Sequence, residues 1–281
     1  MPAHDAARIA RASRGSSFHY SFGLLPRPRR RGIEAVYAFC RAVDDVADGR
    51  ADTRSAAARL ARYRDEVGLC YDGAPTLPET RALQASIRAF GIPRAPLEAI
   101  LEGVEMDLHK TRYADFTELR GYCVRVASAV GLVCLPIFGC RDPRGRDYAT
   151  DLGIALQLVN ILRDLKADAA RGRIYVPQDE LRAFGCAEGA LLAGARDGGY
   201  LALMKHQAGR AWQHFASAAA LLPGGERRRL LAAEVMGAIY RRLLRRIEAG
   251  GFRVFERRIT VPRLTQLSLA MRAWITGRVG A

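Results

Sequence analysis

Residues 157–168 read Gln-Leu-Val-Asn-Ile-Leu-Arg-Asp-Leu-Lys-Ala-Asp, and they reveal more about the chain than any other stretch. Their amide and carboxylate side chains are spaced by three, four and four residues, which puts them on one face of a helix: Gln157, Asn160, Asp164 and Asp168. The flanking leucine, isoleucine and valine residues indicate that this helix is largely buried. Because buried carboxylates are costly unless they are paired or bind metal, the stretch predicts a helical core with a charged site inside it.

Helical periodicity extends over most of the chain, and glycine and proline interrupt it between segments. We expect helices over residues 30–48, 55–71, 79–90, 94–111, 117–138, 148–169, 198–222 and 226–249. Strand signals are nearly absent, since residues 173–177 fit an extended loop better than a sheet. The tail after Val261 can form one more helix. The pattern therefore predicts a single all-α domain over residues 1–281.

The composition is that of an ordinary globular protein, with 281 residues, 49% hydrophobic, 26% charged, 27 Gly and 12 Pro. This excludes a disordered chain, a collagen and a disulfide-stapled miniprotein. The net charge is +15, and all but three of the 44 basic residues are arginines. Such a charge fits nucleic acid, an anionic membrane or a phosphorylated small molecule, and does not choose among them.

The six cysteines have no metal-binding or redox spacing, so we expect reduced thiols packed as small apolar groups. Residues 1–20 lack the apolar core of a secretory signal. The most apolar run, Ala129–Phe138, is too short to cross a membrane and contains Pro136. These features predict a cytoplasmic protein without a membrane span.

A second acidic cluster lies at the end of the segment 30–48, where Asp44 and Asp48 are four residues apart and share a helix face with Arg41 and Tyr37. Two carboxylates at this spacing repel each other, and a hard cation such as Mg²⁺ relieves the repulsion. Taken alone, this cluster is weak evidence, because a solvated acidic helix end is commoner than a metal site.

The two acidic stripes together suggest a specific kind of site, in which metal ions bind between two helices. If they face each other across an apolar cavity, Mg²⁺ held between them could bind a diphosphate and favour its departure from carbon. Five aromatic residues could line such a cavity or simply fill the core: Phe18, Phe22, Tyr37, Tyr122 and Tyr240. A buried salt-bridge network with Arg41 and Arg163 is the alternative reading of the second stripe.

Several ordered motifs resemble the squalene/phytoene synthase family of head-to-head prenyltransferases. They are Ser16-Ser17-Phe18, the segments 37–48, 122–131 and 157–164, and Arg171-Gly-Arg-Ile-Tyr-Val-Pro177. Each motif is modest by itself, but their order is specific and spans about residues 14–265. The resemblance implies the isoprenoid synthase fold, a helical bundle around a central cavity.

The same resemblance implies a role for each matching position. The implied Mg²⁺ ligands, with Mn²⁺ as an alternative ion, are Asp44, Asp45, Asp48, Asn160, Asp164 and Asp168. The implied substrate-binding residues are Ser17, Phe18, Arg41, Gln157, Arg163, Tyr175 and Arg257. Tyr37, Tyr122 and Tyr240 would lie beside the reacting carbons, so that they join the aspartates as implied catalytic residues.

Within the family, the segment Val126–Gly131 is most similar to bacterial presqualene diphosphate synthases of hopanoid biosynthesis. This implies condensation of two farnesyl diphosphates to presqualene diphosphate and pyrophosphate, without NADPH. Two alternatives stay open: a phytoene synthase that uses two geranylgeranyl diphosphates, and a catalytically inactive relative with a scaffold role.

The partners expected from the sequence are isoprenoid diphosphates and a downstream squalene-forming enzyme. The arginines are dispersed without interleaved aromatic residues, so we expect no nucleic-acid binding. The Leu/Arg-rich stretch Tyr240–Ile247 could instead rest on anionic lipid, which would place the protein at the inner membrane surface.

Overall fold

The computed structural model describes residues 22–23, 25–47, 49, 52–196, 198–277 and 279, and this part of the chain is helical without strands. The α-helices are α3 (Arg27–Ala47), α4 (Thr53–Asp72), α5 (Pro78–Phe90), α6 (Arg94–His109), α7 (Phe116–Cys123), α8 (Ala129–Phe138), α9 (Gly145–Ala170), α10 (Gln178–Ala183), α11 (Glu188–Leu192), α12 (Tyr200–Leu221), α13 (Leu231–Ala249) and α14 (Arg263–Thr276). A π-helix, η1 (Val124–Ser128), joins α7 to α8, and a 3-10 turn, η2 (Gly224–Glu226), precedes α13.

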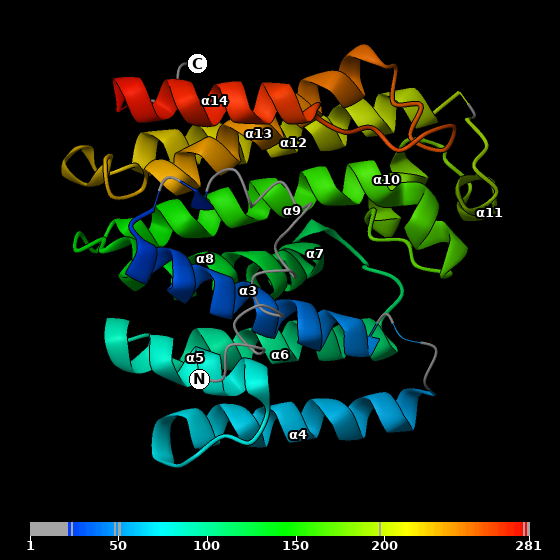
Figure 1. Cartoon of the computed structure of the whole chain (residues 1–281). Coiled ribbons are helices and arrows are strands. Elements are labelled where there is room, and N and C mark those ends of the chain that lie inside the picture. The colour runs from blue at the N-terminus through cyan, green and yellow to red at the C-terminus, as the bar shows by residue number, and fades with distance from the viewer. Residues whose placement is uncertain are drawn as a thin grey trace.

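Helix α9 lies at the centre of the molecule, with α4 at one edge and α14 at the other (Figure 1). It packs against α12, α8, η1 and α13, so it is surrounded by other helices along its length. This is the helix that carries the acidic stripe, and its apolar residues are buried, as the sequence predicted: Leu152, Ile154, Leu158, Val159, Ile161, Leu162 and Leu165.

Helices α7, η1 and α8 form one continuous rod over residues 116–138. Within the described residues, this rod is long and apolar enough to cross a membrane by length and composition, since an 18-residue stretch of it has a mean hydropathy of 1.7. The apolar run Ala129–Phe138 therefore extends further than the sequence suggested. The rod packs between α6 and α9, however, and Val133 and Ile137 are fully buried, which is the environment of a core helix.

The π-turn brings the backbone of η1 unusually close to α9. A Cβ atom on Gly153 would lie 2.5 Å from the Cα atom of Ser128 and 2.6 Å from its amide nitrogen, so only glycine fits there. The buried hydroxyl of Ser128 donates a hydrogen bond of 2.7 Å to the carbonyl of Thr150 on the facing helix. The contact fixes η1 against α9 at the place where both helices line a cavity.

The predicted all-α single domain is confirmed, and most helix boundaries agree within a few residues. One boundary differs clearly, because α13 begins at Leu231 and not at residue 226; Pro223 and two glycines precede it in a 3-10 turn. The tail after Val261 does form a helix, α14. Residues 173–175 have no regular secondary structure, so a loop and not a strand leads into the short helix α10, as expected.

Candidate active site

Two cavities adjoin inside the helical bundle. The first, which we call the apolar chamber, has a volume of about 420 Å³ and is bounded by α3, α6, η1, α8, α9 and α13. The second, which we call the polar cavity, has a volume of about 270 Å³ and lies toward the C-terminal end of α9. Two apolar residues, Val104 and Val126, line both cavities, and so do five polar residues: Arg41, Asp44, Gln157, Asn160 and Arg163. These side chains therefore lie where the apolar chamber meets the polar cavity.

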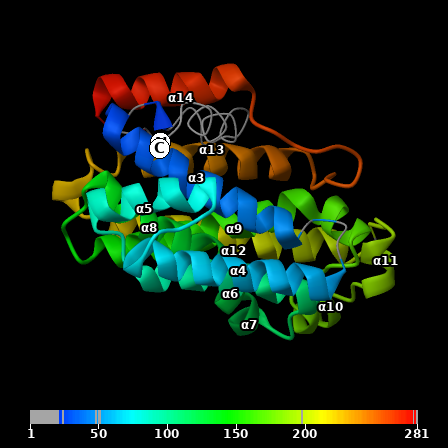
Figure 2. The ribbon, with the colours of Figure 1, turned by 60° about the horizontal axis from the view of Figure 1, so that its bottom comes forward.

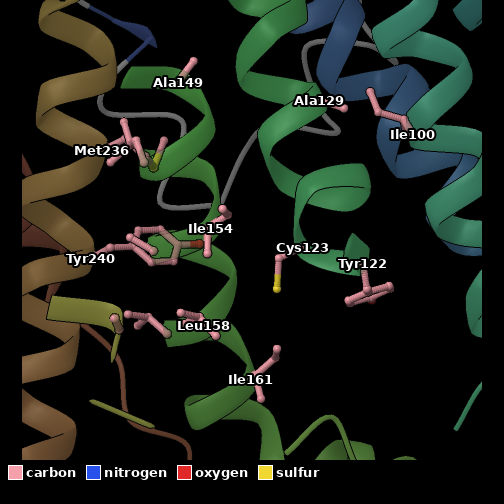
Figure 3. Close-up of a cluster of buried hydrophobic side chains, with 14 of the residues drawn as sticks. Ile100, Tyr122, Cys123, Ala129, Ala149, Ile154, Leu158, Ile161, Met236 and Tyr240 are labelled. Atoms are coloured by element: carbon pink, nitrogen blue, oxygen red, sulfur yellow. The ribbon is translucent and has the colours of Figure 1, made fainter. Parts of the chain in front are cut away.

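The apolar chamber is lined by small and aliphatic side chains on facing helices. On α8 and η1, residues Val126, Val130 and Cys134 are only partly buried because they face this space. Figure 3 shows Met236 and Tyr240 of α13 directed toward α9. A chamber of this kind excludes water from whatever apolar group it holds.

The polar cavity contains four carboxylates and four guanidinium groups: Asp44, Asp107, Asp164, Asp168, Arg41, Arg163, Arg171 and Arg173. They come from α3, α6, α9 and the loop that follows α9. Equal numbers of both charges suit a ligand that consists of an anion and cations together. A diphosphate with divalent ions is such a ligand.

Arg163 is held at the junction by two partners. Its Nε atom donates a 2.9 Å hydrogen bond to Asp164, and its guanidinium also donates to the hydroxyl of Tyr240. Burial alone would lower the pKa of Arg163, but these hydrogen bonds raise it above its usual value. The partly buried ion pair between Arg163 and Asp164 is one element of the predicted salt-bridge network that the structure does contain.

Asn160 has a buried side-chain oxygen, Oδ1, without a hydrogen-bond partner among the described residues. Its amide nitrogen donates to Gln157 at 3.2 Å, which fixes the orientation of the group. Since an unsatisfied buried oxygen is costly, this atom is a natural ligand position for a cation that faces the cavity.

Asp168 lies one helical turn beyond Asp164 and has a strongly perturbed pKa. Burial raises its pKa to about 7, and the negative charge of Asp164 adds to the effect, while Arg171 and Arg173 oppose it. Near neutral pH this carboxyl is therefore only partly ionised, and a cation bound beside it would favour the ionised form. This is the electrostatic condition under which a site gains most from binding a cation.

Asp107 of α6 accepts hydrogen bonds from two tyrosines. The Tyr122 hydroxyl donates to it at 3.0 Å and the Tyr175 hydroxyl at 2.7 Å. The rings of these tyrosines stack with a centroid distance of 5.1 Å, and Tyr113 packs against both. Burial, and then the negative charge of Asp107, raises the pKa of Tyr122 and of Tyr175 well above the usual range. Both phenols therefore remain protonated.

No three carboxylate, imidazole or thiol groups in the described ranges come close enough together to form a metal site by themselves. The carboxylates instead approach the polar cavity from different helices. Mg²⁺ usually keeps several water molecules and binds through one or two carboxylates together with substrate phosphates. The distribution of Asp44, Asp164 and Asp168 suits that mode of binding.

Most residues singled out in the sequence meet at these cavities. The apolar chamber is lined by Tyr37, Tyr240 and Phe22, the polar cavity by Tyr122, Tyr175, Asp164 and Asp168, and both by the five shared polar residues. Ser17, Phe18 and Asp48 lie outside the described residues. Two other expected residues do not line either cavity. Asp45 pairs with Arg41 at 3.1 Å on the surface, and Arg257 is exposed.

Sequence reasoning gave no role to several residues that the structure brings to the site. The only sequence signal for a role of Asp107 in the site is that it is an acidic residue between the apolar residues Met106 and Leu108. Arg171 and Arg173 stand inside a motif that was recognised, but their approach to Asp168 depends on the turn after α9. Arg258 lies 3.4 Å from Asp164, whereas the sequence prediction named its neighbour Arg257 as the diphosphate-binding arginine of this segment.

Comparison with known proteins agrees with this geometry. Residues 11–265 match the family model described as squalene/phytoene synthase. The chain is 39% identical over 239 residues to the presqualene diphosphate synthase of Rhodopseudomonas palustris, covering 85% of each chain. It is 37% identical over 260 residues to the phytoene synthase of Mycobacterium tuberculosis, covering 92% of this chain and 85% of the relative.

Among solved structures, the squalene synthase HpnC from Alicyclobacillus acidocaldarius has a similar fold. The TM-score is 0.78 at 30% identity, over 90% of this chain and 97% of that one. The helical bundle and its paired cavities thus define a prenyltransferase of the isoprenoid class. The chain belongs to the squalene/phytoene synthase family.

Proposed function

We propose that the protein joins two farnesyl diphosphates head to head, in a Mg²⁺-dependent reaction that yields presqualene diphosphate and pyrophosphate. The observation that carries this proposal is the junction of the apolar chamber with the polar cavity. In a substrate with a long hydrocarbon tail and a diphosphate head, the tail matches the apolar chamber and the head matches the polar cavity.

The residues at the junction fit Mg²⁺. Asp44 on α3, and Asp164 and Asp168 on α9, would hold the ions, and the unpartnered oxygen of Asn160 is suited to join them. Mg²⁺ bound there would act as a Lewis acid that stabilises the negative charge of the departing pyrophosphate. Mn²⁺ prefers the same oxygen ligands and is expected to substitute.

The arginines of this chain bind and orient the diphosphates. Arg41 lies at the junction, and Arg171 and Arg173 lie deeper in the polar cavity, so that they can donate to phosphate oxygens. Arg163 is fixed by Asp164 and Tyr240 and presents its charge in a preset direction. Guanidinium groups that are already oriented stabilise the leaving group without further rearrangement.

The proposed reaction breaks one carbon–oxygen bond and forms a cyclopropane ring. The C1–O bond of the donor breaks, its electron pair leaves with pyrophosphate, and an allylic cation remains. The C2–C3 double bond of the acceptor attacks C1, and loss of one proton closes a cyclopropane ring that retains the acceptor's diphosphate. The apolar chamber protects the cation from water, and the aromatic faces of Tyr37 and Tyr240 can stabilise its charge.

The phenols of Tyr122 and Tyr175 line the polar cavity and stay protonated. A phenol that keeps its proton is a much weaker base than pyrophosphate. Released pyrophosphate would lie at the same junction and would therefore be the better acceptor for the proton that is lost.

A second candidate is the condensation of two geranylgeranyl diphosphates, as in phytoene synthases. It is favoured by the 37% identity to the mycobacterial phytoene synthase over 92% of this chain. The 39% identity to a presqualene diphosphate synthase favours the farnesyl substrate, and the two values are close.

Incubation of the purified protein with each pure diphosphate and Mg²⁺, without NADPH, followed by mass spectrometry of the lipids, tests the proposal. Presqualene diphosphate from farnesyl diphosphate supports it. A product from geranylgeranyl diphosphate alone supports the second candidate. Squalene formed when NADPH is added would contradict a reaction that stops at the cyclopropane.

A further inference from the structure

Helix α14 exposes its large apolar side chains and buries its small ones. The side chains that are buried in its packing are Gln266, Ala270 and Ala273, and the helix contacts α13. Most of the exposed large apolar residues among the described positions lie on this one helix: Leu264 (81% exposed), Leu267 (46%), Met271 (47%), Trp274 (65%) and Ile275 (71%). An ordinary surface helix has the opposite arrangement. We call these five residues the α14 face.

The positions of these residues form one stripe along the helix, with steps of three, four, three and one residues. Both ribbon views place α14 at the outside of the molecule (Figures 1 and 2). A continuous exposed apolar stripe of this kind marks an interaction surface.

The surroundings of the α14 face are positively charged. Residues 259–281 contain three arginines and no acidic residue. Arg263 and Arg272 are exposed on α14 itself, and Arg227 and Arg228 line a surface hollow together with Trp274 and Ile275. Exposed leucine and tryptophan beside arginine is the composition of helices that lie in the interface of anionic membranes.

The position of the α14 face relative to the apolar chamber supports the same partner. The hollow beside Trp274 includes Arg227 and Arg228, and the chain then runs directly into Leu230 and Ala232, which line the apolar chamber. The polar cavity lies at the other end of α9, around Asp168. The α14 face is thus close to the end of the chamber that would hold hydrocarbon.

The stretch Tyr240–Ile247, which the sequence suggested as the lipid contact, cannot serve in this way. Its apolar side chains Leu243, Leu244 and Ile247 are buried in the core and only its arginines reach the surface. We propose instead that the α14 face docks on an anionic phospholipid bilayer, with Trp274 and its apolar neighbours inserted shallowly and the arginines on the headgroups. This inference goes beyond the catalysed reaction and holds whichever isoprenoid diphosphate is used.

The two tryptophans of the chain allow a direct test. Trp212 is partly buried and donates to Glu248 at 3.1 Å, so Trp212→Phe leaves Trp274 as the only tryptophan. In this full-length variant we expect the emission to shift to shorter wavelength when phosphatidylcholine vesicles containing phosphatidylglycerol are added. Pure phosphatidylcholine vesicles should give a much smaller shift, and high salt should weaken the effect.

Two pairs of matched variants, assayed by vesicle co-sedimentation, distinguish binding through the α14 face from nonspecific binding of the protein to vesicles. Leu264→Gln with Ile275→Gln should reduce binding at least about tenfold. The same change in the exposed residues Leu69 and Leu201, on α4 and α12, should leave it unaltered. Arg263→Gln with Arg272→Gln should reduce binding roughly fivefold for each arginine removed.

The matched charge control is Arg59→Gln with Arg62→Gln on α4, at the opposite edge of the molecule. The inference is overturned if wild-type protein does not sediment with anionic vesicles, or if both control pairs weaken binding as much as the α14 pairs. It is also overturned if Trp274 emission is insensitive to vesicles because the face is covered by a second copy, which sedimentation velocity would reveal as a dimer.

Discussion

Tyr122 and Tyr175 are stacked on each other and donate to the two oxygens of one carboxylate, that of Asp107. One residue comes from α7 and the other from the loop after α9, so Asp107 on α6 ties three segments together beside the polar cavity. The arrangement fixes both phenols with their hydrogens turned toward Asp107.

Asp107→Asn should lower kcat by about 10- to 100-fold with a smaller effect on KM. Hydrogen bonds to a charged acceptor contribute about 1.5–3 kcal/mol, and the amide can accept through one atom only. Steady-state kinetics with farnesyl diphosphate would measure this split. Because the role is one of positioning, the effects of Asp107→Asn and Tyr175→Phe should be clearly less than additive. Fully additive losses would show that the contact is not a functional unit.

Asp168→Asn should stabilise the metal-free protein, and more so at about pH 8 than at about pH 5. The folded-state pKa of Asp168 is raised to about 7, above the ordinary 3.8. Between these values the folded state binds more protons than the unfolded state, so the stability of the wild type falls as pH rises through this window. We expect a gain of about 1–3 kcal/mol, which is a few degrees in Tm.

Thermal unfolding of both proteins at the two pH values tests this expectation. Added Mg²⁺ should raise the Tm of the wild type at the higher pH, because a ligand of the folded state stabilises it, and should raise that of the variant less. An equal gain in Tm at both pH values would contradict the assigned cause.

The acidic stripe of α9 was predictable because helical periodicity alone puts Asn160, Asp164 and Asp168 on one face. Periodicity also placed Tyr37, Arg41 and Asp44 together. The other site residues, Tyr122 and Tyr175 among them, were named because their motifs resemble the squalene/phytoene synthase family. The fold followed from the same signal, since each predicted helix repeats apolar residues with the helical period.

Contacts between distant segments were not predictable in this way. Asp107 meets Tyr175 across 68 residues of sequence, and the contact depends on how α6 packs against the loop after α9. Whether Arg257 or Arg258 faces Asp164 depends on a turn without periodicity. The size of the apolar chamber depends on side chains from six helices, so substrate length cannot be read from any one motif.

Gly153→Ala should destabilise the protein by about 3 kcal/mol or more, because the new methyl group would lie against backbone atoms of Ser128 that cannot move independently. Each kcal/mol corresponds to about 2–4 °C in Tm for a chain of this size. The matched control is Gly209→Ala in α12, where a Cβ atom would meet nothing within 4 Å. That change should stabilise by up to about 1 kcal/mol, since alanine favours the helix. If both variants melt like the wild type, the close contact of η1 with α9 is not a constraint.

Asp44→Asn and Asp45→Asn should differ sharply although the two residues are adjacent. Asp44 lines both cavities, whereas Asp45 forms an exposed pair with Arg41, with both side chains more than half exposed. We expect Asp44→Asn to reduce kcat by at least about 100-fold and to increase the Mg²⁺ concentration required, because a ligand charge facing the diphosphate is lost. Asp45→Asn should change the rate by less than about fivefold, since an exposed ion pair contributes at most about 1 kcal/mol.

Rates measured over a Mg²⁺ titration, with circular dichroism to verify unchanged helicity, compare the two variants directly. Both remove one negative charge from the same turn of α3, so a difference between them reports the direction of the side chain and not the net charge. Equal losses would mean that the surface pair of Asp45 with Arg41 opens when the diphosphate binds. In that case both aspartates contribute to the metal site, as the sequence first suggested. A full rate in Asp44→Asn would instead remove α3 from the metal site and leave the carboxylates of α9 to hold the ions.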